Sequence, residues 1–272
     1  KQYKSNIESD GHYFIDLLKK QEVSMLFDHL ASKYHLIEIY YLAGESSVEN
    51  SLESPNLSIQ NSIECLTNLL ECAVKVNTKL LFASSGAIYD SRIKNFLDEE
   101  SPILPPSPYA AIKASSENII YAYRESFGLK ANIVRIFSVF GEEMNRFFIY
   151  DMVKKLCDSS DCIEFKGDGK QSRDYLHIAD VVSGLVLVMG RGLEGEAYNL
   201  CSGEGTKIND LVNLAKKILN AKKEVIWNGD KTEGIRNDWY GDNTKILNLG
   251  LQISDKRSAF ENTVLSLKEK FN

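Results

Sequence analysis

The chain has 272 residues, of which 43% are hydrophobic and 26% are charged, with a formal net charge of −6 and a pI near 5.4. This length fits one large α/β domain or a large domain with a smaller partner, and no apolar run approaches the roughly 18 residues of a membrane helix. The acidic balance argues against a general nucleic-acid binder, which usually has a concentrated basic surface. The five cysteines include no Cys-x-x-Cys pair, which argues against a disulfide framework or a zinc site and favours a reducing cytoplasm.

Helical and strand-like segments alternate through the first half of the chain. Apolar residues at helical spacing predict helices over residues 15–30, 58–76 and 109–127. Short β-rich runs predict strands over residues 37–42, 79–83 and 131–140. Such alternation with short connections predicts a doubly wound α/β fold, in which a mostly parallel sheet is covered by helices.

The regular alternation of predicted strands and helices ends after Gly141. Helices are predicted over residues 148–157, 178–189 and 208–219, separated by turn-rich stretches such as residues 166–170. Thr206 is a candidate N-cap for the last of these helices. We therefore expect residues 1–141 to form a nucleotide-binding region. Residues 142–272 are expected to form mainly a smaller α/β substrate region, with some segments returning to the first sheet.

Tyr109 and Lys113 lie four residues apart at the start of a predicted helix, so their side chains can converge on one point. A tyrosine and a lysine at this spacing, taken alone, more often form a surface pair than part of an active site. The neighbouring sequence favours the active-site interpretation here. A phenol titrates near ~10, and a general acid/base works best when its pKa lies near the operating pH. Lowering that pKa by about three units corresponds to ~4 kcal/mol, which a lysine and a bound cationic nicotinamide can share.

Two serines end the predicted buried strand that precedes this helix. Carboxyl ends of parallel strands are where active sites lie, so Ser85 is a candidate to polarise the same substrate oxygen as Tyr109. For Ser84 the expected role of the hydroxyl is a backbone cap at the turn. Prolines at positions 102, 105, 106 and 108 predict an extended loop that fixes where the helix of Tyr109 begins.

Five segments together resemble successive motifs of the extended short-chain dehydrogenases/reductases, the NAD-dependent sugar-nucleotide epimerases, dehydratases and reductases. The segments are LAGESSV at 42–48, FASSGAIY at 82–89, PPSPYAAIK at 105–113, RIFSVFG at 135–141 and GDGKQSRDY at 167–175. They occur in the family's order, and the resemblance runs from about Asp16 to Leu251. It implies a Rossmann-like fold.

The resemblance also implies roles for individual residues. Tyr109 would be the acid/base, Lys113 the partner that lowers its pKa and binds the nicotinamide ribose, and Ser85 the hydroxyl on the reacting sugar oxygen. The cofactor, NAD or NADP, would contact Asp16, Leu17, Leu42, Ala43, Gly44, Ala83, Ser84 and Phe137 in addition to Tyr109 and Lys113. The nucleotide-sugar substrate would contact Ser46, Ser138, Arg173 and Arg236 in addition to Ser85. A surface salt bridge is the rival interpretation for Arg236, and no metal is expected. Helices over residues 58–76 and 109–127 often pair across a dimer in this family, so a homodimer is expected.

One departure from the family pattern concerns the cofactor. The glycine-rich Gly-x-x-Gly-x-x-Gly turn that meets the cofactor pyrophosphate occurs nowhere in the sequence. The family has it several tens of residues before the position of Asp16, whereas only fifteen residues precede Asp16 here. Because residue 1 is Lys and not Met, we expect the first β-α-β part, with the residue that selects NAD or NADP, to precede this sequence. If the sequence is complete, cofactor binding is in doubt.

A second departure concerns the reaction. The family's 4,6-dehydratases carry acidic residues directly after the equivalent of Ser85, where this chain has Gly86 and Ala87. Its nucleotide-sugar decarboxylases usually have a glutamate at the position of Ala87. Neither side chain here can transfer a proton, so we expect a 4-epimerase that works through a 4-keto intermediate. The alternative is an NAD(P)H-dependent reductase of nucleotide 4-keto-6-deoxysugars, followed by a 4,6-dehydratase or a non-catalytic sensor. Ser138 replaces an asparagine common in the family and leaves the nucleotide base open.

Overall fold

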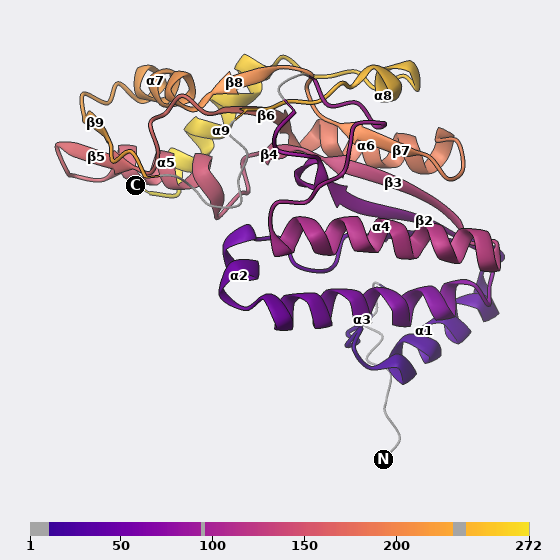
Figure 1. Ribbon diagram of the computed structural model, residues 1–272. Helices are drawn as coiled ribbons and strands as arrows, with labels where there is room; N and C mark the ends of the chain where they lie inside the picture. Colours follow the sequence, from indigo (N-terminus) through magenta and orange to yellow (C-terminus); the bar gives the residue numbers. More distant parts are fainter. Residues whose placement is uncertain (1–10, 94–95, 231–237, 272) are drawn as a thin grey trace.

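A computed structural model describes residues 11–93, 96–230 and 238–271 of the chain (Figure 1). Its main sheet has four strands in the order β1 (Ile37–Tyr41), β2 (Thr78–Ser85), β3 (Lys130–Ile136) and β7 (Ala197–Leu200). Each neighbouring pair in this sheet is parallel. The predicted parallel sheet is therefore confirmed, and β2 and β3 are its central strands.

Helices cover both faces of the main sheet, as Figure 1 shows. One face is covered by α3 (Pro55–Ala73) and α4 (Pro108–Phe127), which lie side by side, with α1 (Lys20–Lys33) packed against α3. The opposite face is covered by α6 (Ile178–Arg191). This arrangement confirms the doubly wound α/β class.

The two faces of β2 explain why its central residues, 80–83, are all apolar. Leu80 and Phe82 point to one face and share a buried cluster with residues of α3 and Ile120 of α4. Leu81 points to the other face and shares a cluster with Val134 and residues of α6. Successive strand residues point to opposite faces, so a strand buried on both faces needs an apolar residue at every position.

The second half of the chain adds smaller sheets beside the main one. In one of them, β6 (Ser172–His177) lies between β4 (Ser138–Phe140) and β10 (Asp238–Trp239) and also pairs with β8 (Gly205–Lys207). A separate pair joins β5 (Cys162–Phe165) to β9 (Glu224–Trp227). The remaining helices here are α5 (Phe147–Cys157), α7 (Ile208–Leu219), α8 (Thr244–Asn248) and α9 (Lys256–Glu269). The helices α5, α7 and α9 enclose a buried apolar cluster of their own.

Three local expectations differ from the structure. The single strand predicted over residues 131–140 is interrupted at Phe137, where the chain leaves the main sheet and enters the β4–β6 sheet. The N-cap of α7 is Lys207, not Thr206, which lies within β8. The short helix α2 (Val48–Glu53) was not predicted, because its few apolar residues carry little periodicity, and it begins after Ser47, whose side chain accepts the Asn50 amide. Among the described helices, none has both the length and the apolar character to cross a membrane.

Candidate active site

The start of α4 is fixed by its capping residues. Ser107 is the N-cap, and its Oγ accepts a hydrogen bond from the Ala110 amide at 3.3 Å. Pro108 occupies the first helical position, where its missing N–H costs no helical hydrogen bond. The Tyr109 amide in turn donates to Ser51 Oγ at 3.1 Å, which ties the first turn of α4 to α2. Tyr109 is thus held at a defined place.

Ser85 is the last residue of β2, at the carboxyl end of the main sheet, and its side chain is buried. Its Oγ accepts the Ala87 amide at 3.2 Å, which fixes the turn after the strand. The same hydroxyl lies close enough to the Tyr109 phenol to lower its pKa. The predicted pair of a strand-end serine and a helix-start tyrosine therefore does meet in the folded chain.

Lys113 lies one turn further along α4 and is only 8% exposed. Its ammonium donates to the Ala83 carbonyl at 2.9 Å and lies 5.2 Å from the centre of the Phe82 ring. Burial lowers the pKa of Lys113 to about 8, against the opposing influence of the Glu117 and Glu45 carboxylates. This lysine therefore changes charge close to physiological pH.

This shifted pKa makes the stability of the protein depend on pH. Between pH 8 and the ordinary lysine pKa of 10.5, the unfolded chain binds a proton at Lys113 that the folded chain has lost, so the free energy of unfolding rises with pH in this window. The full effect is on the order of 3 kcal/mol for a shift of this size. We expect Lys113→Met to remove this rise, measured by urea unfolding at pH 7.5 and 9.5. The exposed Lys130→Met is the matched control, and an equal rise in both variants would contradict the assignment.

The Tyr109 phenol has a raised pKa in the protein. Burial is the main cause, the hydrogen bond from Ser85 lowers the pKa, and the Glu45 carboxylate raises it. The sequence predicted that Lys113 would lower it, but the ammonium of Lys113 is bound to the Ala83 carbonyl. The protein side chains by themselves therefore favour the neutral phenol.

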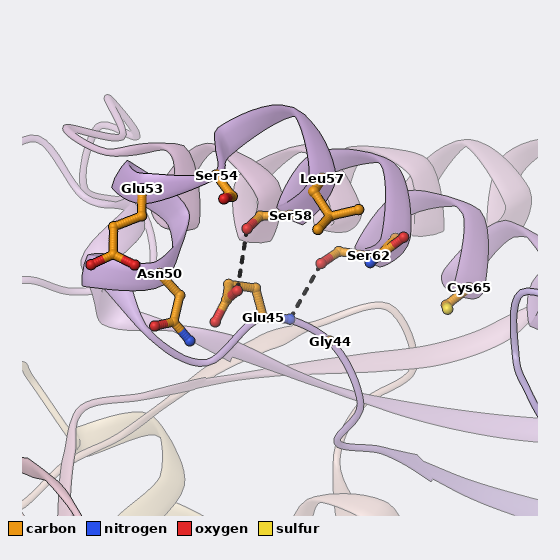
Figure 2. Close-up of a pocket in the computed structure, with 10 residues that line it drawn as sticks. Gly44, Glu45, Asn50, Glu53, Ser54, Leu57, Ser58, Ser62 and Cys65 are labelled. Carbon is orange, nitrogen blue, oxygen red and sulfur yellow. Dashed lines mark hydrogen bonds between the residues drawn. The ribbon is translucent and has the colours of Figure 1, made fainter.

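Glu45 is a charged residue near the site that the sequence did not single out. It follows Gly44, whose φ of +115° lies in the region that favours glycine. Its carboxylate accepts the Ser46 and Ser47 amides, both at 2.8 Å, and the Ser58 hydroxyl at 3.2 Å. A pocket of about 450 Å³ opens here between the loop after β1 and α3, and Figure 2 shows Glu45 at its edge.

The predicted cofactor residues at the N-terminal side lie along β1 and α3. Leu42, Ala43 and Gly44 follow β1 directly and are exposed. The turn of Asp16 and Leu17 lies beside α3, since the Asn68 side-chain amide donates to the Leu17 carbonyl at 3.0 Å. These five residues thus border the β1 side of the main sheet.

Phe137 and Gly86 pack closely together next to Ser85. A Cβ atom added at Gly86 would lie 2.7 Å from the Phe137 ring, which is too close for any side chain without movement of that ring. Phe137 is itself 5% exposed and packs on Tyr89 and Trp239, with ring centres 6.5 and 5.6 Å away. A carboxylate at position 86 would therefore require the Phe137 ring to move.

Two of the predicted substrate residues lie on the second sheet, which is formed by β4, β6, β8 and β10. Ser138 begins β4 opposite Tyr175 of β6, and Arg173 of β6 donates to the Ser172 carbonyl at 2.9 Å. The Arg173 guanidinium also lies 6.0 Å from the Trp239 ring, and Trp239 contacts Phe137, which packs against Gly86 next to Ser85. This contact joins the second sheet to the site. Arg236 lies outside the described residues.

Two further residues at the site were missed from the sequence. Trp239 has a buried indole Nε1 with no hydrogen-bond partner within the described part of the chain. Arg146, before α5, donates to Ser46 Oγ at 3.4 Å and so reaches the loop after β1. Neither belongs to a motif with fixed spacing, so only their three-dimensional contacts identify them.

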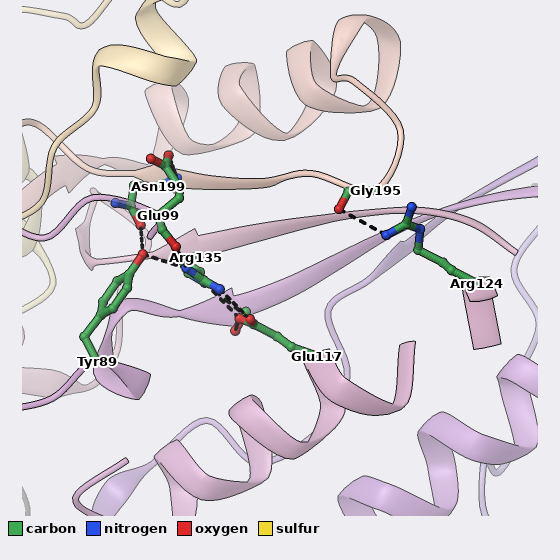
Figure 3. Close-up of polar contacts among 8 residues, drawn as sticks. Tyr89, Glu99, Glu117, Arg124, Arg135, Gly195 and Asn199 are labelled. Carbon is green, nitrogen blue, oxygen red and sulfur yellow. Dashed lines mark hydrogen bonds and ion pairs between the residues drawn. The ribbon is translucent and has the colours of Figure 1, made fainter. Parts of the chain in front are cut away.

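A buried polar network lies directly behind the serines, and Figure 3 shows its main members. Glu117 of α4 forms an ion pair with Arg135 of β3 at 2.8 Å, and both side chains are less than a tenth exposed. The Ser84 hydroxyl donates to the Glu117 carboxylate, so the expected backbone cap at Ser84 is wrong. Arg135 also donates to Tyr89 Oη at 2.9 Å, and this hydroxyl donates to Asn199 Oδ1 at 2.7 Å. The network links α4 to three strands of the main sheet.

Comparisons with known proteins agree with this geometry. The family model for GDP-mannose 4,6 dehydratase matches residues 8–249. A UDP-glucuronate 4-epimerase of Thermodesulfobacterium geofontis is 29% identical over 227 residues, which make up 80% of this chain and 68% of that enzyme. The chain spans 48–63% of the length of three further curated relatives that it matches.

Solved structures give the same picture. The UDP-glucose 4-epimerase of Thermotoga maritima, determined with UDP-glucose, superposes with a TM-score of 0.88 at 25% identity, covering 97% of this chain and 87% of that one. A dTDP-glucose 4,6-dehydratase of Streptomyces venezuelae, determined with NAD, superposes with a TM-score of 0.85 at 26% identity, covering 94% of this chain and 78% of that one. Similar proteins thus include both epimerases and dehydratases, and overall likeness does not choose between the two reactions.

Proposed function

Because this chain belongs to the GDP-mannose 4,6-dehydratase family of extended short-chain dehydrogenases/reductases, we propose that it is an NAD(P)-dependent 4-epimerase of nucleotide sugars. The observation that carries the choice is the contrast at the end of β2. Ser85 lies beside the Tyr109 phenol, one helical turn from Lys113, whereas Gly86 and Ala87 offer no acid. This set can transfer one proton but lacks the second proton-transfer group that elimination of water needs.

The residues around the site fit the nicotinamide half of the cofactor. Ala43 and Gly44 are small and exposed at the end of β1, so a ligand can approach their backbone closely. The Lys113 ammonium has three donor hydrogens, which suits the hydroxyls of a ribose. The Ala83 carbonyl, which accepts from Lys113, and Phe137, which packs against Gly86, border the same part of the site. We assign none of the described residues to the cofactor diphosphate.

The reaction that these residues support uses one acid/base and one hydrogen-bond donor. Bound NAD(P) would supply a hydride acceptor and donor for C4 of the sugar. The Tyr109 phenolate takes the proton of the 4-hydroxyl group and later returns it. The Ser85 hydroxyl donates to the same sugar oxygen, and the positive charge of a bound nicotinamide, added to that of Lys113, would favour the phenolate that the protein side chains by themselves do not. Rotation of the 4-keto sugar between the two hydride transfers inverts the carbon.

Substrate binding is assigned to the second sheet and the loop after β1. Ser46, Ser138 and Arg173 are the proposed contacts, and the forked guanidinium of Arg173 suits a diphosphate. Arg236 keeps this role as a proposal from the sequence. The relatives named above act on UDP-glucuronate and UDP-glucose, which makes UDP-hexoses the first substrates to test.

We extend the proposal to the regions of the chain and its assembly. Residues 1–141 would bind the cofactor and residues 142–272 mainly the substrate, although β7 from the second region joins the main sheet.

A homodimer through α3 and α4 is supported by Leu57, Ile59 and Tyr121, which leave large apolar surfaces exposed on these helices. The five cysteines are free thiols, which supports a cytoplasmic location.

Incubation with nucleotide sugars tests this proposal. With UDP-glucose or UDP-glucuronate and NAD+, we expect the C4 isomer to form with no lasting change in absorbance at about 340 nm, because the hydride returns to the sugar. Stoichiometric loss of NAD(P)H with a 4-keto sugar would identify a reductase and contradict the proposal. Binding of the nucleotide sugar without turnover of any substrate would favour the sensor and contradict it as well.

A further inference from the structure

Glu117 continues the line of Tyr109 and Lys113 along α4. The three residues are spaced four apart, so they lie on one face of the helix in successive turns. Lys113 donates to the Ala83 carbonyl at 2.9 Å, and Glu117 accepts the hydroxyl of the next residue, Ser84. Two consecutive residues of β2 are therefore tied to two consecutive turns of α4, immediately before the catalytic serine.

The Glu117 carboxylate is held in place from behind by Arg135. Both oxygens contact the guanidinium, with Nε at 3.2 and 3.3 Å and the terminal nitrogen at 2.8 Å. Arg135 also donates to the Glu99 carbonyl at 2.7 Å and lies 5.1 Å from the Tyr89 ring. Burial lowers the pKa of Arg135, but the bond and charge of Glu117 outweigh burial and raise it overall. The Arg135 guanidinium therefore keeps its charge beside Glu117.

We propose that Glu117 is a positioning residue of the active site, whose carboxylate, anchored on Arg135, fixes the end of β2 through Ser84 and is a counter-charge one helical turn from the Lys113 ammonium. This inference rests on the proposed proton-transfer role of Tyr109 and Lys113. Glu117 itself is buried behind the serines and acts through its neighbours.

The charges around Lys113 make this role distinct from simple structural support. On α4 it is flanked by the Tyr109 phenol and the Glu117 carboxylate, and from the loop after β1 it faces the Glu45 carboxylate. From β2 it contacts the Ala83 carbonyl and the Phe82 ring. Burial opposes the charge on the ammonium, and of the two carboxylates that favour it, Glu117 has the larger influence. Loss of the Glu117 charge should therefore leave Lys113 neutral over a wider pH range.

The variants must separate loss of charge from loss of folding. Glu117→Gln leaves Arg135 buried without a counter-charge, so it can unfold the protein. The double variant Glu117→Met/Arg135→Met replaces the whole pair with apolar side chains of similar length, a change that buried ion pairs often tolerate. Ser84→Ala is the matched control, because it removes the tie to β2 and keeps the ion pair.

The test is the titration of Lys113 followed by NMR in protein labelled with [6-13C]lysine, with its signal assigned from Lys113→Arg. In the folded double variant, we expect the Lys113 midpoint to fall by about one pH unit from the wild-type value, because the Glu117 carboxylate favours the ammonium, whereas Arg135 is not among the main charges that influence it. In Ser84→Ala the midpoint should stay at the wild-type value. An unchanged midpoint in the double variant would overturn the proposal, as would an equal fall in Ser84→Ala.

A pH profile provides the second readout. We expect the alkaline limb of kcat to move to lower pH in the double variant by the same amount as the NMR midpoint, whereas a purely structural defect would lower kcat equally at all pH values. A uniform loss with no movement of the limb would overturn the proposal. If the protein turns over none of the substrates tested, the proposed function fails, while the NMR midpoint still decides the role of Glu117.

Discussion

Replacing Tyr109 with Phe is expected to lower kcat for C4 epimerisation by about 10²–10⁴-fold, the usual contribution of a positioned acid/base. The change removes only the phenolic oxygen that exchanges a proton with the 4-hydroxyl group. The ring stays, and the backbone bond from this residue to Ser51 is unaffected. Binding of the nucleotide sugar, measured by calorimetry, should change much less than kcat.

The matched control for this variant is Tyr121→Phe. Tyr121 lies about three turns further along the same helix and is 57% exposed, and its Phe variant keeps the apolar ring on the proposed dimer face, so this variant should retain wild-type kcat. Wild-type turnover by Tyr109→Phe would remove Tyr109 from the mechanism. A loss of similar size in both variants would indicate a general effect on α4 instead.

The largest effect on stability is expected at Arg135. Replacing it with Met leaves the Glu117 carboxylate buried and without its cation, which typically costs about 3–5 kcal/mol of unfolding free energy. Breaking the exposed pair of Lys245 and Glu196, whose atoms are 2.7 Å apart, by Glu196→Gln should cost less than about 1 kcal/mol. Urea unfolding of the two single variants measures the difference.

The double variant completes this comparison. With Glu117→Met added to Arg135→Met, no buried charge is left uncompensated, so much of the lost stability should return. Such a recovery would show that the penalty comes from the unpaired charge. A cost for Arg135→Met as small as that for Glu196→Gln would contradict the buried ion pair.

The long elements of the fold could be predicted because their apolar patterns are local and strong. The helix expected over residues 58–76 and the strand over 79–83 are present as α3 and β2, with ends shifted by a few residues. Pro55 at the first helical position sets where α3 begins. Ser107 at the N-cap sets where α4 begins in the same way. The interruption at Phe137 could not be predicted, because the local pattern of a β-rich segment carries no sign that it crosses between two sheets.

The candidate site could be predicted in part for the same reason. Ser85 ends a strand and Tyr109 and Lys113 begin a helix, so local sequence sets where each side chain lies. Glu117 and Arg135 could not be predicted as part of the site, because the sequence alone does not distinguish a buried charged residue from one exposed to solvent. Tyr89 and Asn199, which are 110 residues apart, meet only through the sheet topology.

In the proposed reaction, hydride leaves C4 of the sugar and returns to the same carbon, while Tyr109 takes and returns the proton of the 4-hydroxyl group. Its most direct test uses a UDP-hexose carrying deuterium at C4, incubated with the protein and NAD+ in ordinary water. The account predicts that the C4 isomer forms and keeps the deuterium at C4, because the hydride does not exchange with solvent. Loss of the deuterium to water during isomerisation, or no isomer with any UDP-hexose, would contradict it.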